Sequence, residues 1–236
     1  MRAEDAGRTS AAYLEIKRRI IRLEIPPGGS FTEGQIAADL GFSKTPVREA
    51  LAQLRRERLV VIDARSGCRA SPVTIKDAMD LGAFRGLLEG EAASLAAHSV
   101  RDVEQLRALD SLCDASYHAG DSTSIDEFLG LNTEFHCTIA RAGGNERLAA
   151  ALEEVLHQLE RLFRIGLLYT SRADEIVHEH KDLVGAIMAG DAEAARSVAI
   201  AQARAAQKMI VDGLISSPEI LATNIGNPTL PARGRS

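Results

Sequence analysis

The chain has 236 residues, enough for two modest domains, and 45% of them are hydrophobic while only 4% are aromatic. No apolar run approaches the ~20 residues that span a membrane, and the charged first ten residues lack the apolar core of a secretory signal. Three scattered cysteines fit free thiols in a reducing compartment. These features predict a cytoplasmic protein without a membrane segment, and the abundance of Ala and Leu predicts a mostly α-helical fold.

Charge is unevenly distributed along the chain. The net charge is −5, but residues 1–72 carry 13 Lys and Arg against 9 Asp and Glu, a balance of +4. The remainder carries 15 against 24, a balance of −9. A basic first third joined to an acidic remainder suggests a module that binds a polyanion, attached to a body with a different task.

The first third has the pattern of a winged helix-turn-helix domain, which we predict over residues 11–71 after a disordered lead at residues 1–10. Apolar spacing predicts a first helix over residues 11–24, and two prolines and two glycines follow as a turn. A second helix lies within residues 31–40, where Thr32 and Gln35 have capping-box spacing. A third helix is predicted over residues 44–57, and short β runs at 59–62 and 68–70 form a two-stranded wing.

The third helix has the layout of a DNA-recognition helix. Ser43 is placed to cap it, and one stripe of the helix is apolar: Val47, Ala50, Leu51 and Leu54. Lys44, Thr45 and Arg48 lie off that stripe at the N-terminal end, where a recognition helix contacts base edges and phosphates.

The segment SKTPVREAL, residues 43–51, closely resembles the DNA-binding domain of the GntR family of bacterial transcription regulators. The resemblance implies that Lys44, Thr45, Arg48 and Gly67 contact DNA, with Gly67 letting the wing backbone approach the duplex. Lys44 stands where the family usually has Arg. An ammonium lacks the planar guanidinium that donates two hydrogen bonds to one guanine, so that contact is lost at this position. Arg58 stands where the family usually has Gly, at the turn into the wing.

The rest of the chain predicts an all-α bundle over residues 72–215, followed by a disordered tail at 216–236. A junction containing Pro72 precedes it, and Thr74 with Asp77 has the spacing of another capping box. Six helical patterns follow, over residues 75–98, 102–118, 124–142, 146–169, 171–188 and 191–215, with Asn145 as the cap of the fourth.

This bundle resembles the FCD (FadR-like) effector domain of many GntR regulators, and its six helices resemble the VanR-type branch, whose members respond to small aromatic or hydroxy acids. The sequence motifs that carry the resemblance are Arg85-x-x-x-Glu89, Glu134-Phe135-His136 and Glu179-His180. The resemblance implies a cavity inside the bundle that binds a small carboxylic-acid effector. Its lining would include Arg85, Asn132, His136, His180 and Gln202.

The same resemblance implies a divalent metal, such as zinc, nickel or manganese, but only His136 and His180 of its usual ligands are present. Asn132 replaces an Asp and Gln202 replaces a His, so a tight metal site is disfavoured. One alternative is that the two histidines hydrogen-bond Asn132 and Gln202. For Arg85, a helical ion pair with Glu89 is an equal alternative to a contact with the acid.

Taken together, the sequence predicts a homodimeric transcription factor, acting as a repressor, that binds a near-palindromic double-stranded DNA operator and releases it in response to a small acid. No nucleophile elbow, phosphate loop or HExxH motif indicates an enzyme. Two alternatives remain open: a DNA-binding regulator without an effector, and a metal-dependent enzyme built on the bundle.

Overall fold

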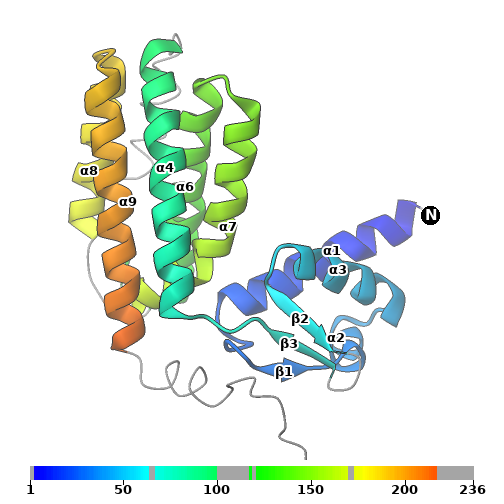
Figure 1. Ribbon diagram of the computed structural model, residues 1–236. Coiled ribbons are helices and arrows are strands. Elements are labelled where there is room, and N and C mark those ends of the chain that lie inside the picture. The colour runs from blue at the N-terminus through cyan, green and yellow to red at the C-terminus, as the bar shows by residue number, and fades with distance from the viewer. Residues whose placement is uncertain (1–2, 64–66, 100–116, 119–120, 170–172, 217–236) are drawn as a thin grey trace, which may run out of the picture.

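The computed structural model describes residues 3–63, 67–99, 117–118, 121–169 and 173–216. They form a small winged-helix domain beside a taller bundle of roughly parallel and antiparallel helices (Figure 1). Among the described residues, no helix is both long and apolar enough to cross a membrane.

The winged-helix domain packs three helices against a small sheet. Its elements are α1 (Ala3–Ile21), β1 (Ser30–Phe31), α2 (Glu33–Leu40), α3 (Lys44–Arg56), β2 (Val60–Asp63) and β3 (Gly67–Ala70). The strands are antiparallel in the order β1-β3-β2. The two wing strands were predicted, but β1 was not, because a strand of two residues has no pattern to detect.

Helix α1 corrects the predicted disordered lead, because it begins at Ala3 rather than at residue 11. Its early turns are held to α3, since the hydroxyl of Thr9 donates a hydrogen bond to Glu49 at 2.8 Å. Ala12 and Ile16 then enter the core with no exposed surface. Tertiary packing therefore extends the helix beyond its periodic segment.

Local signals in α2 and α3 are largely confirmed. Thr32 and Gln35 form the predicted capping box of α2. The apolar stripe of α3 is buried as predicted, although the Ser43 side chain makes no cap hydrogen bond and the helix ends at Arg56. Arg58 has φ +59°, a left-handed conformation that L-residues other than Gly adopt at a cost. This is the position where the family usually has Gly.

Five helices of the bundle lie among the described residues: α4 (Ile75–Ser99), α6 (Ser122–Ala142), α7 (Glu146–Tyr169), α8 (Ala173–Met188) and α9 (Ala192–Ile215). Each matches a predicted helix within two residues at its described ends, and Thr74 with Asp77 and Asn145 make the predicted caps. The helix predicted at 102–118 and the tail predicted from 216 lie almost wholly outside the described residues. Helices α4 and α9 run side by side along the bundle (Figure 1).

The two domains are joined tightly at the junction. Val73 is buried in the bundle core only three residues after Ala70, which is buried in the winged-helix core. Arg161 of α7 donates to the carbonyl oxygens of Ser71 at 2.5 Å and Pro72 at 3.2 Å. The linker is therefore held from the bundle side.

A second tie joins α1 to the bundle. Asp126 of α6 forms ion pairs with Arg22 after α1 and with Arg164 of α7. Leu23 packs against the bundle core beside them. The winged helix is thus fixed to the bundle at two places, both of which involve α7.

Candidate functional site

Three of the four predicted DNA-contact residues lie beside the N-terminal end of α2: Lys44, Arg48 and Gly67. Lys44, Thr45 and Arg48 are exposed on the first turns of α3. The Cε atom of Lys44 lies 3.7 Å from where a Cβ on Gly34 would be, so the Lys44 stem passes over the start of α2. Gly67 has φ +85° and lies against the Phe31 carbonyl at the other side of that helix end. One edge therefore carries the recognition helix and the wing together.

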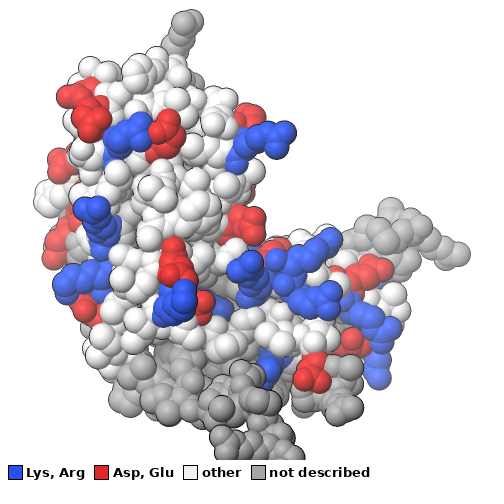
Figure 2. Space-filling view, viewed as in Figure 1, with Lys and Arg blue, Asp and Glu red and all other residues white. Residues whose placement is uncertain are grey.

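The charge of this edge is not uniformly positive. On the face that Figure 2 shows, Lys and Arg side chains gather over α1 and α3, whereas over the bundle they alternate with Asp and Glu. Arg48 is paired with Glu33, the first residue of α2, through Nη2 and Oε2 at 3.0 Å. Glu33 was not among the predicted site residues, because no sequence pattern links positions on two separate helices.

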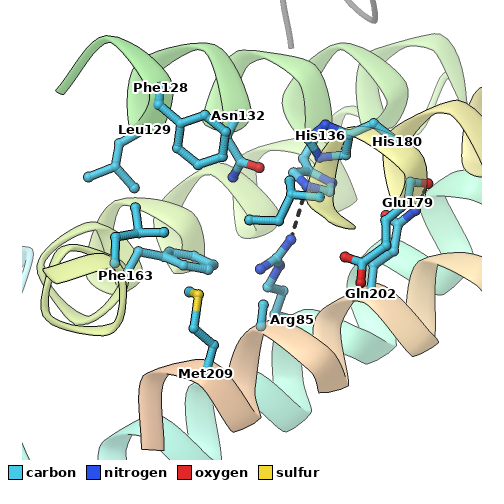
Figure 3. A pocket seen from close by; sticks show the side chains of 13 residues that line it. Arg85, Phe128, Leu129, Asn132, His136, Phe163, Glu179, His180, Gln202 and Met209 are labelled. Atoms are coloured by element: carbon cyan, nitrogen blue, oxygen red, sulfur yellow. Dashed lines mark hydrogen bonds between the residues drawn. The ribbon is translucent and has the colours of Figure 1, made fainter. Parts of the chain in front are cut away.

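A second candidate site lies inside the bundle, where α4, α6, α7, α8 and α9 enclose a cavity. All five predicted lining residues meet there: Arg85, Asn132, His136, His180 and Gln202. Figure 3 shows Arg85 reaching toward His136, with Phe163 and Met209 on one side and Glu179 and Gln202 on the other. The cavity that remains is about 20 Å³, room for one water molecule, so the side chains close it in this state.

Arg85 is held by two partners. Its Nε donates to Oε1 of Glu89 at 2.6 Å, and its Nη2 lies 3.0 Å from Nε2 of His136. A guanidinium is always a donor, so Nε2 of His136 accepts, and its proton is on Nδ1, 3.1 Å from Oε1 of Glu89. The predicted Arg85–Glu89 ion pair is therefore present, as part of a triad with His136.

Burial keeps the histidines neutral. It is the main cause that lowers the pKa of His136 well below its usual value, and the charge of Arg85 adds to this effect. Burial likewise lowers the pKa of His180 to about 3. Burial raises the pKa of Glu89, which Arg85 opposes. Arg85 and Glu89 are thus the ionisable pair of the site, and the two imidazoles serve as neutral hydrogen-bonding groups.

The alternative that the histidines bond to the two amides is wrong. His136 bonds to Arg85 and Glu89, and the amide of Gln202 donates to the backbone carbonyl of Glu179. Within this site, three buried atoms have no hydrogen-bond partner among the described residues: Glu89 Oε2, His180 Nδ1 and Gln202 Oε1. A buried polar atom left unpaired costs about 1–3 kcal/mol. His180 and Gln202 line the cavity, and each carries one such open group.

The residues present do not fit the divalent metal that the fold family implies. Both ring nitrogens of His136 are engaged, and Asn132 and Gln202 supply neutral amides in place of a carboxylate and an imidazole. Within the part of the chain that the structure describes, no three His, Cys, Asp or Glu side chains are grouped to hold a metal ion. The site is built around Arg85 instead.

Other residues of the pocket were not predicted. Phe128, Leu129, Phe163, Leu167 and Met209 supply its apolar wall. Their helical spacing indicated only a core, since the same periodicity serves any buried helix face.

A winged helix that exposes the start of α3, joined to a helical bundle with an internal cavity, is the architecture of a DNA-binding regulator. The sequence matches the bacterial regulatory proteins of the gntR family over residues 8–69 and the FCD domain over residues 80–204. The chain belongs to the GntR family of transcriptional regulators and carries an FCD domain, so it is a regulator and not an enzyme.

Relatives agree with this family over most of the chain. A regulator from Streptomyces ambofaciens, found in an unstable DNA locus, is 29% identical over 98% of this chain and 97% of its own. The regulator YdhC of Bacillus subtilis is 30% identical over 80% of this chain and 84% of its own. A probable D-xylose utilization operon repressor of Paenarthrobacter nicotinovorans is 29% identical over 76% of this chain and 78% of its own.

Solved structures share the fold. McbR/YncC of Escherichia coli superposes with a TM-score of 0.71 at 21% identity, covering 87% of this chain and 97% of that one. A GntR regulator from Rhodococcus sp. RHA1 gives the same TM-score at 20% identity, covering 87% and 98%.

Proposed function

We propose that this protein is a homodimeric repressor whose bundle binds a small hydroxy acid without a metal and thereby weakens operator binding. The observation that carries the proposal is a buried Arg85 in a cavity with an apolar wall and two open polar groups. Arg85 uses two of its five N–H groups on Glu89 and His136, so three remain for a carboxylate. A bidentate carboxylate suits that geometry.

The open groups of the cavity favour a hydroxyl on the same acid. Gln202 Oε1 is an acceptor and His180 Nδ1 is a second hydrogen-bonding atom, and both lack partners among the described residues. A hydroxyl donates its one hydrogen to Gln202 Oε1, and its oxygen accepts from Nδ1 of His180 in the tautomer that carries the proton there. The apolar wall that includes Phe163 and Met209 then contacts the carbon skeleton, and the flexible Met209 side chain is suited to making room.

Helix α7 would transmit the effect of acid binding from the cavity to the DNA-binding domain. Phe163 and Leu167 line the cavity, while Arg161 and Arg164 on other faces of the same helix hold the linker and Asp126. Because the cavity has room for only one water molecule in this state, an entering acid has to move side chains of its wall, Met209 and Phe163 among them. A shift of Phe163 would move α7, and with it the Arg161 side chain that holds the linker carbonyls. The coupling expected between two such sites is about 1–3 kcal/mol.

An exposed apolar face of α4 supports the homodimer. Met79, Phe84 and Leu87 are 49%, 48% and 70% exposed, and they share one side of the helix. Exposed patches of this kind mark association surfaces. The two winged-helix domains of the dimer would then contact half-sites about one helical turn of DNA apart on a near-palindromic operator. Light scattering should give twice the 25.3 kDa chain mass, and Leu87→Asp should give the monomer.

The experiment uses operator duplexes selected from a random library by the purified protein. Hydroxy acids and matched acids without the hydroxyl are then screened for a rise in melting temperature and a loss of operator affinity. A hydroxy acid should act on the wild type, lose its advantage over the matched acid in Gln202→Met, and have no effect on Arg85→Met/Glu89→Met. If no acid acts in a broad panel, the protein is a regulator without an effector of this class.

A further inference from the structure

Glu33 places a carboxylate on the edge that the proposed function assigns to DNA. Its oxygens lie 3.0 Å from Nη2 and 3.2 Å from Nε of Arg48. The Arg48 side chain is 67% exposed, and that of Glu33 is 27% exposed. The pair thus joins the first turn of α2 to the second turn of α3, at the surface where the recognition helix begins.

Stability alone does not account for this carboxylate. A surface ion pair contributes little to folding stability, whereas a negative charge on a phosphate-binding edge weakens binding to every duplex. The backbone at Glu33 is well fixed, because the Thr32–Gln35 capping box encloses this residue. From that backbone the Glu33 carboxylate is paired with Arg48, which lies off the core stripe near the N-terminus of α3.

The geometry of the pair leaves one edge of the guanidinium open. The carboxylate covers the side made by Nε and Nη2, so the end-on pair of N–H groups on Nη1 and Nη2 stays available. That pair matches O6 and N7 of guanine. A free arginine chooses among many rotamers and contacts phosphates readily, whereas a buttressed one presents a single orientation.

We propose that Glu33 is a specificity-determining residue, which orients Arg48 to read a guanine and lowers affinity for DNA in general. The proposal rests on the proposed placement of Arg48 in the major groove. It assigns different effects to the two members of the pair. Loss of Arg48 removes the base contact. Loss of the Glu33 charge strengthens binding to all duplexes and reduces the discrimination between bases at one base pair.

The test compares Glu33→Gln with Glu49→Gln, a matched loss of charge at the residue next to Arg48 that instead accepts a bond from Thr9. The Arg48→Ala variant first identifies the base pair, as the operator position where discrimination is lost. Glu33→Gln should bind random duplex several-fold more tightly. The slope of the logarithm of its binding constant against the logarithm of salt concentration should be steeper by about one. Its discrimination at the identified base pair should fall about ten-fold. Glu49→Gln should raise general affinity only.

The outcomes separate this inference from the proposed function. If Arg48→Ala leaves operator affinity unchanged, the proposed DNA edge is wrong and the inference falls with it. If Arg48→Ala weakens binding equally to all sequences, Arg48 contacts phosphate and the inference alone is overturned. If Glu33→Gln behaves as Glu49→Gln does, with discrimination intact, Glu33 is only a local charge and the inference is likewise overturned.

Discussion

Replacing Arg85 by Met should destabilise the bundle in a pH-dependent way. Glu89 is 3% exposed and has Arg85 as its cation, with Nε and Oε1 2.6 Å apart. Without Arg85, only the neutral His136 ring still contacts the Glu89 carboxyl, so burial raises the pKa of that carboxyl further. Removing one partner of a buried ion pair costs about 3–5 kcal/mol, which is the loss of unfolding free energy expected at pH 7.

The direction in which the free energy of unfolding changes with pH follows from proton binding. A carboxyl whose pKa is raised by folding binds its proton more tightly in the folded state. Its contribution is therefore fully present below the unfolded pKa and is lost as pH rises through the folded pKa. Arg85 opposes the effect of burial on Glu89 in the wild type, so this loss should be small there. In Arg85→Met the loss should begin at the unfolded pKa of about 4.3 and grow as pH rises toward neutral.

Urea unfolding followed by circular dichroism at pH 5, 7 and 9 measures the effect, with m-values compared to confirm that the transition is the same. The double variant Arg85→Met/Glu89→Met should recover most of the stability, because it removes the buried charge together with its partner. Equal dependence on pH in wild type and Arg85→Met would refute the reasoning.

Three further results are expected. Arg58→Gly should raise the free energy of unfolding by about 0.5–1 kcal/mol in urea titrations, because φ +59° strains any residue with a Cβ; an unchanged or lower midpoint would contradict this. Arg161→Met should bind both operator and acid but lose the coupling between them in anisotropy titrations, and coupling at the wild-type level would count against the α7 route. Dialysis against EDTA should leave the melting temperature and acid affinity unchanged, whereas a fall that zinc or nickel reverses would show a functional metal.

Local features of this fold were predictable from the sequence. The Thr32–Gln35 and Thr74–Asp77 caps are confirmed because the interacting groups are three residues apart. The apolar stripe of α3 and the boundaries of the bundle helices follow from periodicity in the same way. The turn at Arg58 shows a limit of this approach, since a substitution of the family glycine left the left-handed backbone in place.

Partners far apart in the sequence were the part that could not be predicted. His136 meets Arg85 across 51 positions, and this contact determines which ring nitrogen carries the proton. One alternative drawn from the family resemblance had instead paired the two histidines with the amides of Asn132 and Gln202. Likewise Arg48 and Glu33 are 15 positions apart on two helices, and only the crossing of α2 and α3 brings them together.

The junction at residues 71–73 bears on how such regulators can be recombined. Ala70 is buried in the winged-helix core, Val73 is buried in the bundle core, and Arg161 holds the carbonyls between them. The described residues between the two domains therefore include no flexible linker. A hybrid that joins this winged helix to a different bundle needs a residue in the place of Arg161 and a pocket for Val73. Without them the hybrid would still bind its operator, but as an unregulated protein.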